Sequence, residues 1–278
     1  MLNIGIVGLG LIGGSMAKSA KKNTDSRIFG YDLQHSVTEY ALLSGIIDEE
    51  LSQSNLSQCD VVFVCLYPKA SVDYISENAG FFKKDSIVLD CAGVKRSVCE
   101  PCYKLAQDNN FNFVGGHPMA GTQFSGIKNS KDTMFYNACF VLVPKHAENV
   151  EIIARAREAV LAVGFSRVSV MTAERHDELI AFTSQLAHVV SNAYVKSPSA
   201  KSHKGISAGS YRDLTRVAYL NENMWTELFI DNRDNLIREI DCLIDNLKEY
   251  SQALKDSDEE KMRHILLEGK LAKEAIGK

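Results

Sequence analysis

One histidine, His117 in the segment VGGHPMAG (114–121), is well suited to acid–base chemistry. It follows the apolar run FNFV, which is typical of a strand, so we expect it at the end of that strand. A neutral imidazole has a pKa of about 6.5 and can accept a proton from a substrate hydroxyl. An isolated histidine is more often a satisfied loop residue, so a catalytic role depends on which other groups lie near it.

A glycine-rich turn, Gly8-x-Gly10-x-x-Gly13, follows the first apolar run and opens a helical pattern. The first glycine permits a tight bend, the second lets the backbone approach a pyrophosphate, and the third lets helix and strand pack closely. The start of the helix, at Leu11 and Ile12, offers free N–H groups and a positive dipole to phosphates. The pattern alone can be a turn without a ligand, but its context predicts a dinucleotide site.

A carboxylate follows the next apolar run, RIFGYD, which ends at Asp32, nineteen residues after Gly13. There it can accept hydrogen bonds from the hydroxyls of the adenosine ribose. A 2′-phosphate would meet like charge, and no arginine immediately follows Asp32. We therefore expect NAD rather than NADP as the cofactor.

The elements that must position these groups change in kind near residue 171. Before it, short β-branched runs alternate with helical stretches such as 11–22 and 150–163; the runs lie in NIGIVG, RIFGYD, DVVFVCL, SIVLDCA, NFVGG, CFVLVP and RVSVM. Strands that are apolar on both faces and separated by helices indicate a mostly parallel, doubly wound α/β sheet. We predict an NAD-binding Rossmann-type domain over residues 1–171, with its ligands at the carboxyl ends of the strands.

From residue 172 onward the pattern is helical, apart from one polar loop at 197–210. We predict an all-helical domain over residues 172–278 that contributes to substrate binding. Its helices carry more apolar surface than a bundle of this size readily buries. We therefore expect a homodimer formed through this half.

Polar side chains on the helical half can form a second wall of the site. On an uninterrupted helix from residue 172, Ser184 and His188 each fall within about 20° of Asp177. Such a polar seam can face a substrate, or it can be a hydrogen-bonded contact between helices.

The segment GSYRDLTRVA places Arg212 and Arg216 one helical turn apart. The guanidinium fork of Arg216 can hold a carboxylate by two parallel hydrogen bonds. The alternative is a surface or interdomain ion pair, with Asp213 nearby in the sequence.

Composition narrows the class of protein. A net charge of −4 argues against a nucleic-acid or anionic-membrane partner, and the longest apolar runs are only strand-length. The N-terminus shows no export signal. Seven cysteines, including an isolated Cys99-x-x-Cys102, lack the spacing of a disulfide framework or a metal site. We expect reduced thiols, a cytoplasmic location and no bound metal.

Together these segments resemble the prephenate and arogenate dehydrogenase family of tyrosine biosynthesis. Besides the glycine turn and Asp32, the shared motifs are DCAGVK (90–95), GGHPMAG (115–121), SQLAH (184–188), SYRDLTRVA (210–218) and NMWTELF (223–229). The resemblance implies NAD-dependent oxidative decarboxylation of prephenate to 4-hydroxyphenylpyruvate, or of arogenate to tyrosine. We expect neither a fused chorismate mutase nor a C-terminal regulatory domain.

The resemblance also implies residue roles. His117 matches the catalytic histidine that bonds the substrate hydroxyl and accepts its proton, and Arg216 matches the arginine that holds a substrate carboxylate. Ser184 and His188 match pocket positions on the helical domain. Trp225 lies in a segment that the family places near the dimer contact and the pocket wall.

The sequence departs from the family pattern at two places. Members often carry Gly-Ser before Val-Lys, whereas here Ala92 and Gly93 stand there. Gly93 is a predicted substrate-binding position, and a hydroxyl that could orient His117 is missing. A glutamate often found two residues after the last glycine of the histidine motif is Gln123 here. Both departures bear on substrate choice and feedback rather than on the reaction class.

Two other functions are compatible with the sequence. Another two-domain NAD-dependent dehydrogenase, acting on a hydroxy or imino acid, would usually have a catalytic lysine on the helical domain. Candidate lysines occur instead just before the polar loop, at Lys196, and within it, at Lys201 and Lys204. The other alternative is an NAD-sensing protein without turnover, against which the presence of both His117 and Arg216 argues. An assay with NAD+ and prephenate separates the three.

Overall fold

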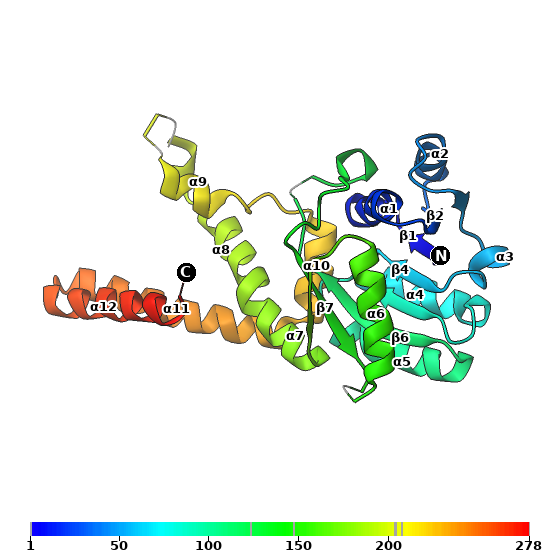
Figure 1. The fold of residues 1–278 in the computed structure, drawn as a ribbon. Coiled ribbons are helices and arrows are strands. Elements are labelled where there is room, and N and C mark those ends of the chain that lie inside the picture. Colours follow the sequence, from blue (N-terminus) through cyan, green and yellow to red (C-terminus); the bar gives the residue numbers. More distant parts are fainter. Residues whose placement is uncertain (1, 123, 147, 203–204, 207, 278) are drawn as a thin grey trace.

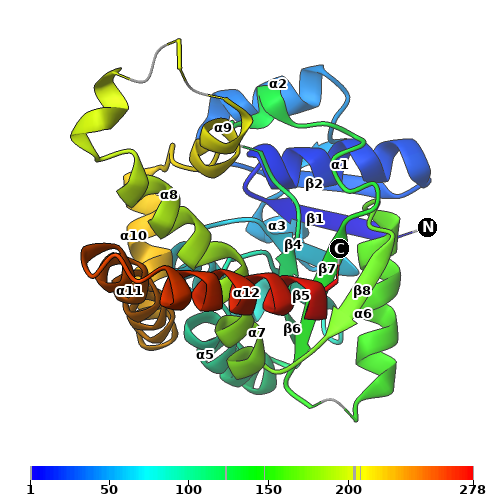
Figure 2. The ribbon, with the colours of Figure 1, turned by 90° about the vertical axis from the view of Figure 1, so that its left-hand side faces the viewer.

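The computed structural model describes residues 2–122, 124–146, 148–202, 205–206 and 208–277. Its first half is a twisted sheet with helices on both faces, and its second half is helical (Figure 1). The last two helices project away from the sheet in Figure 1, and in the view turned by 90° they lie in front of the rest of the molecule (Figure 2). None of the described helices combines the length and the apolar character that crossing a bilayer requires.

Among the described residues, eight strands form a single sheet in the order β3-β2-β1-β4-β5-β6-β7-β8. Neighbouring strands are parallel except for β6 and β7, so β7 and β8 run against the rest. This confirms the mostly parallel, doubly wound sheet. The strands are β1 (Asn3–Val7), β2 (Arg27–Tyr31), β3 (Glu49–Glu50), β4 (Val61–Val64), β5 (Ile87–Asp90), β6 (Asn112–Pro118), β7 (Cys139–Pro144) and β8 (Arg167–Val170).

Seven of these strands coincide with the predicted apolar runs. The eighth, β3, was not predicted, because two consecutive glutamates carry neither β-branched side chains nor an alternating pattern. It pairs with β2 at the edge of the sheet, where a short and charged strand resists pairing with other chains.

Each face of the sheet has its own apolar core, because successive side chains of a strand point to opposite faces. Along β6, Val114 belongs to one core and Phe113 to the other. The first face is covered by α1 (Leu11–Asn23), α2 (His35–Leu43) and α6 (Val150–Ala162). The second is covered by α3 (Gln53–Leu56), α4 (Pro68–Asn78) and α5 (Arg96–Asn109). Single 3-10 turns lie at η1 (Ala79–Phe81) and η2 (Ile127–Asn129).

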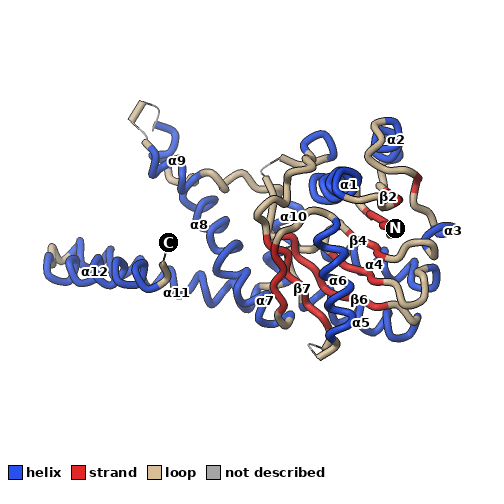
Figure 3. The backbone as a smooth tube through the Cα atoms, viewed as in Figure 1, coloured by secondary structure: helices blue, strands red, loops and turns tan. Residues whose placement is uncertain are grey.

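All described elements after β8 are helical, as Figure 3 shows, which confirms the predicted helical second half. They are α7 (Ala173–Ile180), the π-helical turn η3 (Ala181–Leu186), α8 (Ala187–Tyr194), η4 (Pro198–Ser202), α9 (Gly209–Thr215), α10 (Glu222–Asp231), α11 (Arg233–Lys255) and α12 (Glu259–Ala275). The first of them is capped by Thr172, whose hydroxyl accepts a hydrogen bond from the N–H of Arg175.

The two long C-terminal helices leave apolar side chains uncovered. Along α11, four of them recur at spacings of seven, three and seven residues and are 41% to 69% exposed: Ile237, Ile244, Leu247 and Leu254. Three more are at least half exposed on α12: Leu266, Leu267 and Leu271. We call these seven residues the apolar stripe. Its spacing puts the α11 members on one face of that helix.

Polar contacts join the helical half to the sheet. Arg96, at the start of α5, bonds Asp234 and Asn232 of the helical half. The hydroxyl of Ser97 donates to Asp231 at 2.8 Å. The N–H of Lys69 in the first turn of α4 donates to the Glu227 carboxylate of α10 at 2.6 Å.

Candidate active site

The glycine turn lies between β1 and α1, at the carboxyl edge of the sheet. Gly8 has a φ of +86°, and a Cβ there would lie 2.7 Å from the carbonyl oxygen of Cys65. A Cβ on Gly13 would lie 2.0 Å from the carbonyl oxygen of Gly8, so only glycine allows the helix this close. A Cβ on Gly10 would meet nothing within 4 Å, which leaves open space above the turn. This shape fits a pyrophosphate at the start of α1, beside Leu11 and Ile12.

Asp32 lies directly after β2 and faces the same turn. Its Oδ2 accepts the N–H of Leu9 at 2.9 Å, and its Oδ1 accepts the N–H of Gln34 at 3.0 Å. These bonds fix the carboxylate but use only part of the acceptor capacity of its two oxygens. The remainder is available to ribose hydroxyls, so the residues present fit an NAD molecule.

His117 lies near the end of β6, and its ring contacts the helical half. Its Nδ1 lies 2.8 Å from Nε2 of His176 on α7, and the Nδ1 of His176 lies 2.7 Å from Oδ1 of Asp177. Because the carboxylate can only accept, Nδ1 of His176 donates and its Nε2 accepts. His117 then carries its proton on Nδ1, and its Nε2, which bonds no residue in the described part of the chain, is left as an acceptor. The hydrogen-bond chain from Asp177 thus fixes the ring with Nε2 as its acceptor nitrogen.

Electrostatics keep both imidazoles of this chain neutral. Burial, the neighbouring His176 and the Lys95 ammonium together hold the pKa of His117 well below its usual value. Burial lowers the pKa of His176 as well, although its bond to Asp177 opposes the shift. Burial raises the pKa of Asp177, but hydrogen bonds from His176 and from the N–H groups of Arg96 and Lys95 outweigh this, so the carboxyl stays ionised.

His176 was not predicted as a site residue. It occupies the role expected of the missing hydroxyl at Gly93, because it orients the ring of His117. The sequence does carry one signal for His176, namely that it stands next to Asp177 at the start of a helix. This signal alone does not indicate that His176 contacts His117.

The predicted polar seam on the helical half is wrong. The prediction assumed an uninterrupted α-helix, whereas η3 is a π-helical turn. An extra residue in a turn rotates the rest of the helix by about 100°, so His188 does not share a face with Asp177. Asp177 is fully buried and bonds the start of α5, while Ser184 and His188 are only partly buried.

His188 and Trp225 come together as a second cluster. Their rings are 4.0 Å apart between centroids, and the ring of Phe229 lies 5.2 Å from that of Trp225. Nδ1 of His188 lies 2.8 Å from the carbonyl oxygen of Ser184, which leaves Nε2 as the free acceptor. Burial lowers the pKa of His188, and the charge of nearby Arg216 lowers it further.

Arg216 lies just beyond α9 and is exposed. The ion pair with Asp213 that was its alternative role is not seen, and Arg216 has no salt bridge to any residue the structure describes. The second cluster makes no hydrogen bond or ring contact with His117 across the described ranges.

Gly93 lies between the sheet and α10. A Cβ on it would lie 3.1 Å from Cδ2 of Leu228, so glycine allows α10 to approach the turn after β5. Gln123 and Lys204 lie outside the described residues, so the structure does not place them.

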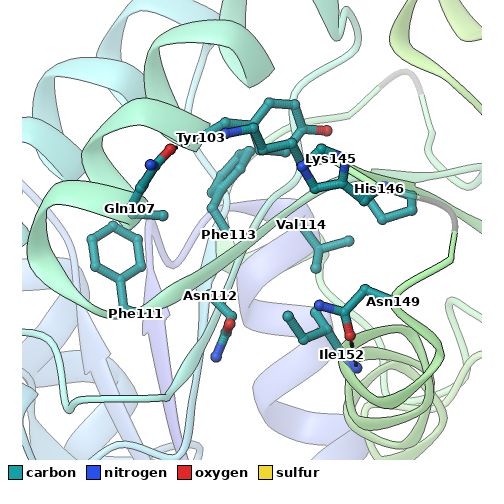
Figure 4. Close-up of a pocket in the computed structure, with 12 residues that line it drawn as sticks. Tyr103, Gln107, Phe111, Asn112, Phe113, Val114, Lys145, His146, Asn149 and Ile152 are labelled. Atoms are coloured by element: carbon teal, nitrogen blue, oxygen red, sulfur yellow. Dashed lines mark hydrogen bonds between the residues drawn. The ribbon is translucent and has the colours of Figure 1, made fainter.

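A separate cavity of about 410 Å³ lies at the opposite edge of the sheet, shown in Figure 4. Tyr103 and Gln107 of α5, Phe113 of β6, and Asn149 and Ile152 at the start of α6 surround it (Figure 4). Its lining includes neither the glycine turn nor any other predicted site residue. It is therefore not the site described above.

The sheet topology, the glycine turn and the carboxylate after β2 define a two-domain NAD-dependent dehydrogenase with a helical second half. Residues 16–169 match the family model of the prephenate dehydrogenase nucleotide-binding domain. Residues 172–268 match that of the prephenate dehydrogenase dimerization domain. The chain belongs to the prephenate dehydrogenase family, which confirms the resemblance seen in the sequence.

Three known proteins illustrate the similarity. Cyclohexadienyl dehydrogenase from Zymomonas mobilis is 30% identical over 285 residues, covering 99% of this chain and 96% of its own. Prephenate dehydrogenase from Aquifex aeolicus, solved with hydroxyphenyl propionate and NAD+, is 27% identical with a TM-score of 0.86, covering 99% and 98%. Arogenate dehydrogenase from Synechocystis is 25% identical with a TM-score of 0.83, covering 99% and 100%. The chain is thus similar to enzymes named for related substrates.

Proposed function

We propose that the protein catalyses the NAD-dependent oxidative decarboxylation of prephenate to 4-hydroxyphenylpyruvate, with His117 as the catalytic base. The observation that carries this is the hydrogen-bond chain Asp177–His176–His117, which ends in an Nε2 that bonds no described residue, at the same edge of the sheet as the glycine turn. A relative with the same fold was solved with NAD+ and a hydroxyphenyl acid, which supports an aromatic acid as the substrate class.

The cofactor would be held by the backbone of the glycine turn and by Asp32, with phosphates at the start of α1 near Leu11 and Ile12. Bound NAD+ supplies the acceptor for the hydride that leaves the ring carbon bearing the hydroxyl. Because aromatisation drives the reaction, the residues of this chain need only position the ring and accept and return one proton.

Nε2 of His117 would accept the hydroxyl proton as the carbon–oxygen double bond forms. The bond from Nδ1 to His176, which is itself held by the Asp177 carboxylate, would keep the ring oriented during this step. The ring carboxylate then leaves as CO2, its bonding electrons complete the aromatic ring, and His117 returns the proton to the phenol oxygen. Atoms and charge balance without further protons.

The helical half would hold the rest of the substrate. We propose that Arg216 binds a substrate carboxylate, since its guanidinium is exposed and lies close enough to His188 to affect its pKa. The stacked rings of His188 and Trp225, with Ser184 and the turn at Gly93, would form the wall of the pocket.

Arogenate is the second candidate substrate, because relatives named cyclohexadienyl and arogenate dehydrogenase cover the chain end to end. The same ring chemistry would give tyrosine. Purified protein should be mixed with NAD+ and either substrate, while NADH absorbance and CO2 release are followed. With prephenate, we expect NADH and CO2 to form in equal amounts. NAD+ binding without NADH formation from either substrate would contradict the proposal and leave the sensing alternative.

We further propose a homodimer that covers the apolar stripe. The stripe lies on helices of the half that matches the dimerization domain, and nothing else in the described chain covers it.

All seven cysteines are unpaired, which supports a reducing compartment such as the cytoplasm.

A further inference from the structure

We propose that a buried ion pair, Lys95 with Asp90, positions His117 for the reaction. The inference rests on the function proposed above and deepens it. Both side chains are fully buried, and the Nζ of Lys95 bonds the Asp90 carboxylate directly. A buried ion pair gives little net stability compared with apolar side chains of the same volume, so its presence calls for another reason.

The pair replaces hydrogen bonds that the sheet cannot supply. β5 pairs with β6 only as far as Leu89 and Val114, whereas β6 continues past His117. The Gly116 peptide groups that face β5 therefore need other partners. The N–H of Gly116 donates to Oδ1 of Asp90 at 3.0 Å, and its carbonyl accepts from Nζ of Lys95. Both groups of the residue before His117 are held by the pair.

The same segment also holds the ring of His117. The backbone N–H groups of Lys95 and Arg96 donate to the two oxygens of Asp177 at 2.8 and 2.9 Å. Asp177 bonds His176, which in turn bonds Nδ1 of His117. The side chain of Lys95 thus fixes the strand that carries His117, and its backbone fixes the chain that orients the ring.

The Lys95 ammonium also favours the neutral form of the ring. The charged groups nearby are Asp90 at the end of β5 and Lys95 on the following turn, which bond Gly116, and Asp177 on α7, which reaches the ring through His176; the neighbour on β7, Val141, is apolar. The ammonium of Lys95 opposes protonation of the imidazole, which keeps the base ready.

The test removes both charges at once, in the variant Asp90→Asn/Lys95→Met, because removing one would leave the other buried and unpaired. We expect kcat with prephenate to fall roughly ten- to a hundredfold. The affinity for NAD+ and the KM for prephenate should change little. The acid limb of kcat/KM should move to higher pH, since Lys95 no longer opposes protonation. The control, Asp60→Asn/Lys83→Met, removes an ion pair at the other end of the strands, where Nζ lies 2.6 Å from Oδ1, and should keep wild-type kcat.

A folded variant with wild-type kcat and an unmoved acid limb would overturn the proposal. If the variant does not fold, the wild-type protein still provides a test. Histidine nitrogen NMR should show His117 neutral, with its proton on Nδ1, down to a pH below 6.5. A proton on Nε2 instead would show that the chain from Asp177 does not orient the ring, and would also overturn the proposal. This spectrum needs no turnover, so failure of the prephenate assay and failure of the positioning role are separate results.

Discussion

Replacing His117 by asparagine tests the proposed base with little disturbance of the fold. The amide N–H of the new side chain can donate to Nε2 of His176, as Nδ1 of His117 does at 2.8 Å in the native protein. Asparagine lacks a basic atom in place of the free Nε2. The change therefore removes proton acceptance and keeps the hydrogen bond.

The size of the effect follows from the surroundings of the ring. A positioned general base contributes about 10²–10⁴ in rate. Burial, His176 and Lys95 all lower the pKa of His117, so it is a weaker base than free imidazole. We therefore expect kcat to fall by about 10²–10³, the lower part of that range, equivalent to about 2.7–4 kcal/mol.

The assay is steady-state NADH formation from prephenate across pH, with NAD+ affinity measured separately by calorimetry. In the native protein kcat/KM should fall on the acid side of pH 6.5, because the pKa of His117 is lowered and the protonated ring cannot accept a proton. The His117→Asn protein should lose that limb and keep its NAD+ affinity. His264→Asn, the same change at an exposed position on α12, should behave as wild type. A His117→Asn protein with kcat within about threefold of wild type and an intact acid limb would refute the role of His117 as base.

Further predictions concern the cofactor, the substrate, the dimer and pH. Asp32→Ala should narrow the preference for NAD+ over NADP+ by about tenfold, measured as the ratio of kcat/KM values, because like-charge repulsion of the 2′-phosphate is lost. Wild-type protein that uses both equally well would contradict this. Arg216→Lys should raise the KM for prephenate by about ten- to a hundredfold and lower kcat less, because lysine cannot form two parallel bonds. A lower melting temperature with normal KM would instead make Arg216 structural. Leu247→Glu, at a position 57% exposed in the apolar stripe, should give monomers in sedimentation experiments, and an unchanged dimer would exclude this face as the interface. The free energy of unfolding should fall as pH drops below about 6.5, because the lowered pKa values of His117 and His176 make the unfolded chain bind more protons; a stability that does not change between pH 7 and 5 would contradict it.

Local patterns predicted those parts of the fold that local chemistry determines. Apolar runs located seven strands, and the glycine spacing located the turn whose backbone the structure shows at Gly8, Gly10 and Gly13. The position of Asp32 could be predicted as well, because the residue after a strand lies at the end of that strand. The short edge strand β3 could not be predicted from its residues, because it is a strand through its pairing with β2 rather than through its own side chains.

The surroundings of His117 could not be predicted in this way. His176 is 59 residues away in the other half of the chain, and their contact depends on how the halves pack. The π-helical turn between Asp177 and His188 changes the register of the helix without a proline or glycine to announce it. The buried pair of Asp90 and Lys95 was visible only as two charged residues in a shared motif, because burial is a property of the folded chain.

We expect the contacts that join the two halves to couple their unfolding. Asp177 is fully buried, and its carboxylate is satisfied by N–H groups that belong to the sheet half. If the sheet half melted alone, this charge would lose its donors, and Asp234 would lose its bonds to Arg96. The helical half would therefore lose hydrogen bonds to its carboxylates once the sheet half is gone. Calorimetry should show one heat-absorption peak for a chain whose sequence pattern changes abruptly at residue 171.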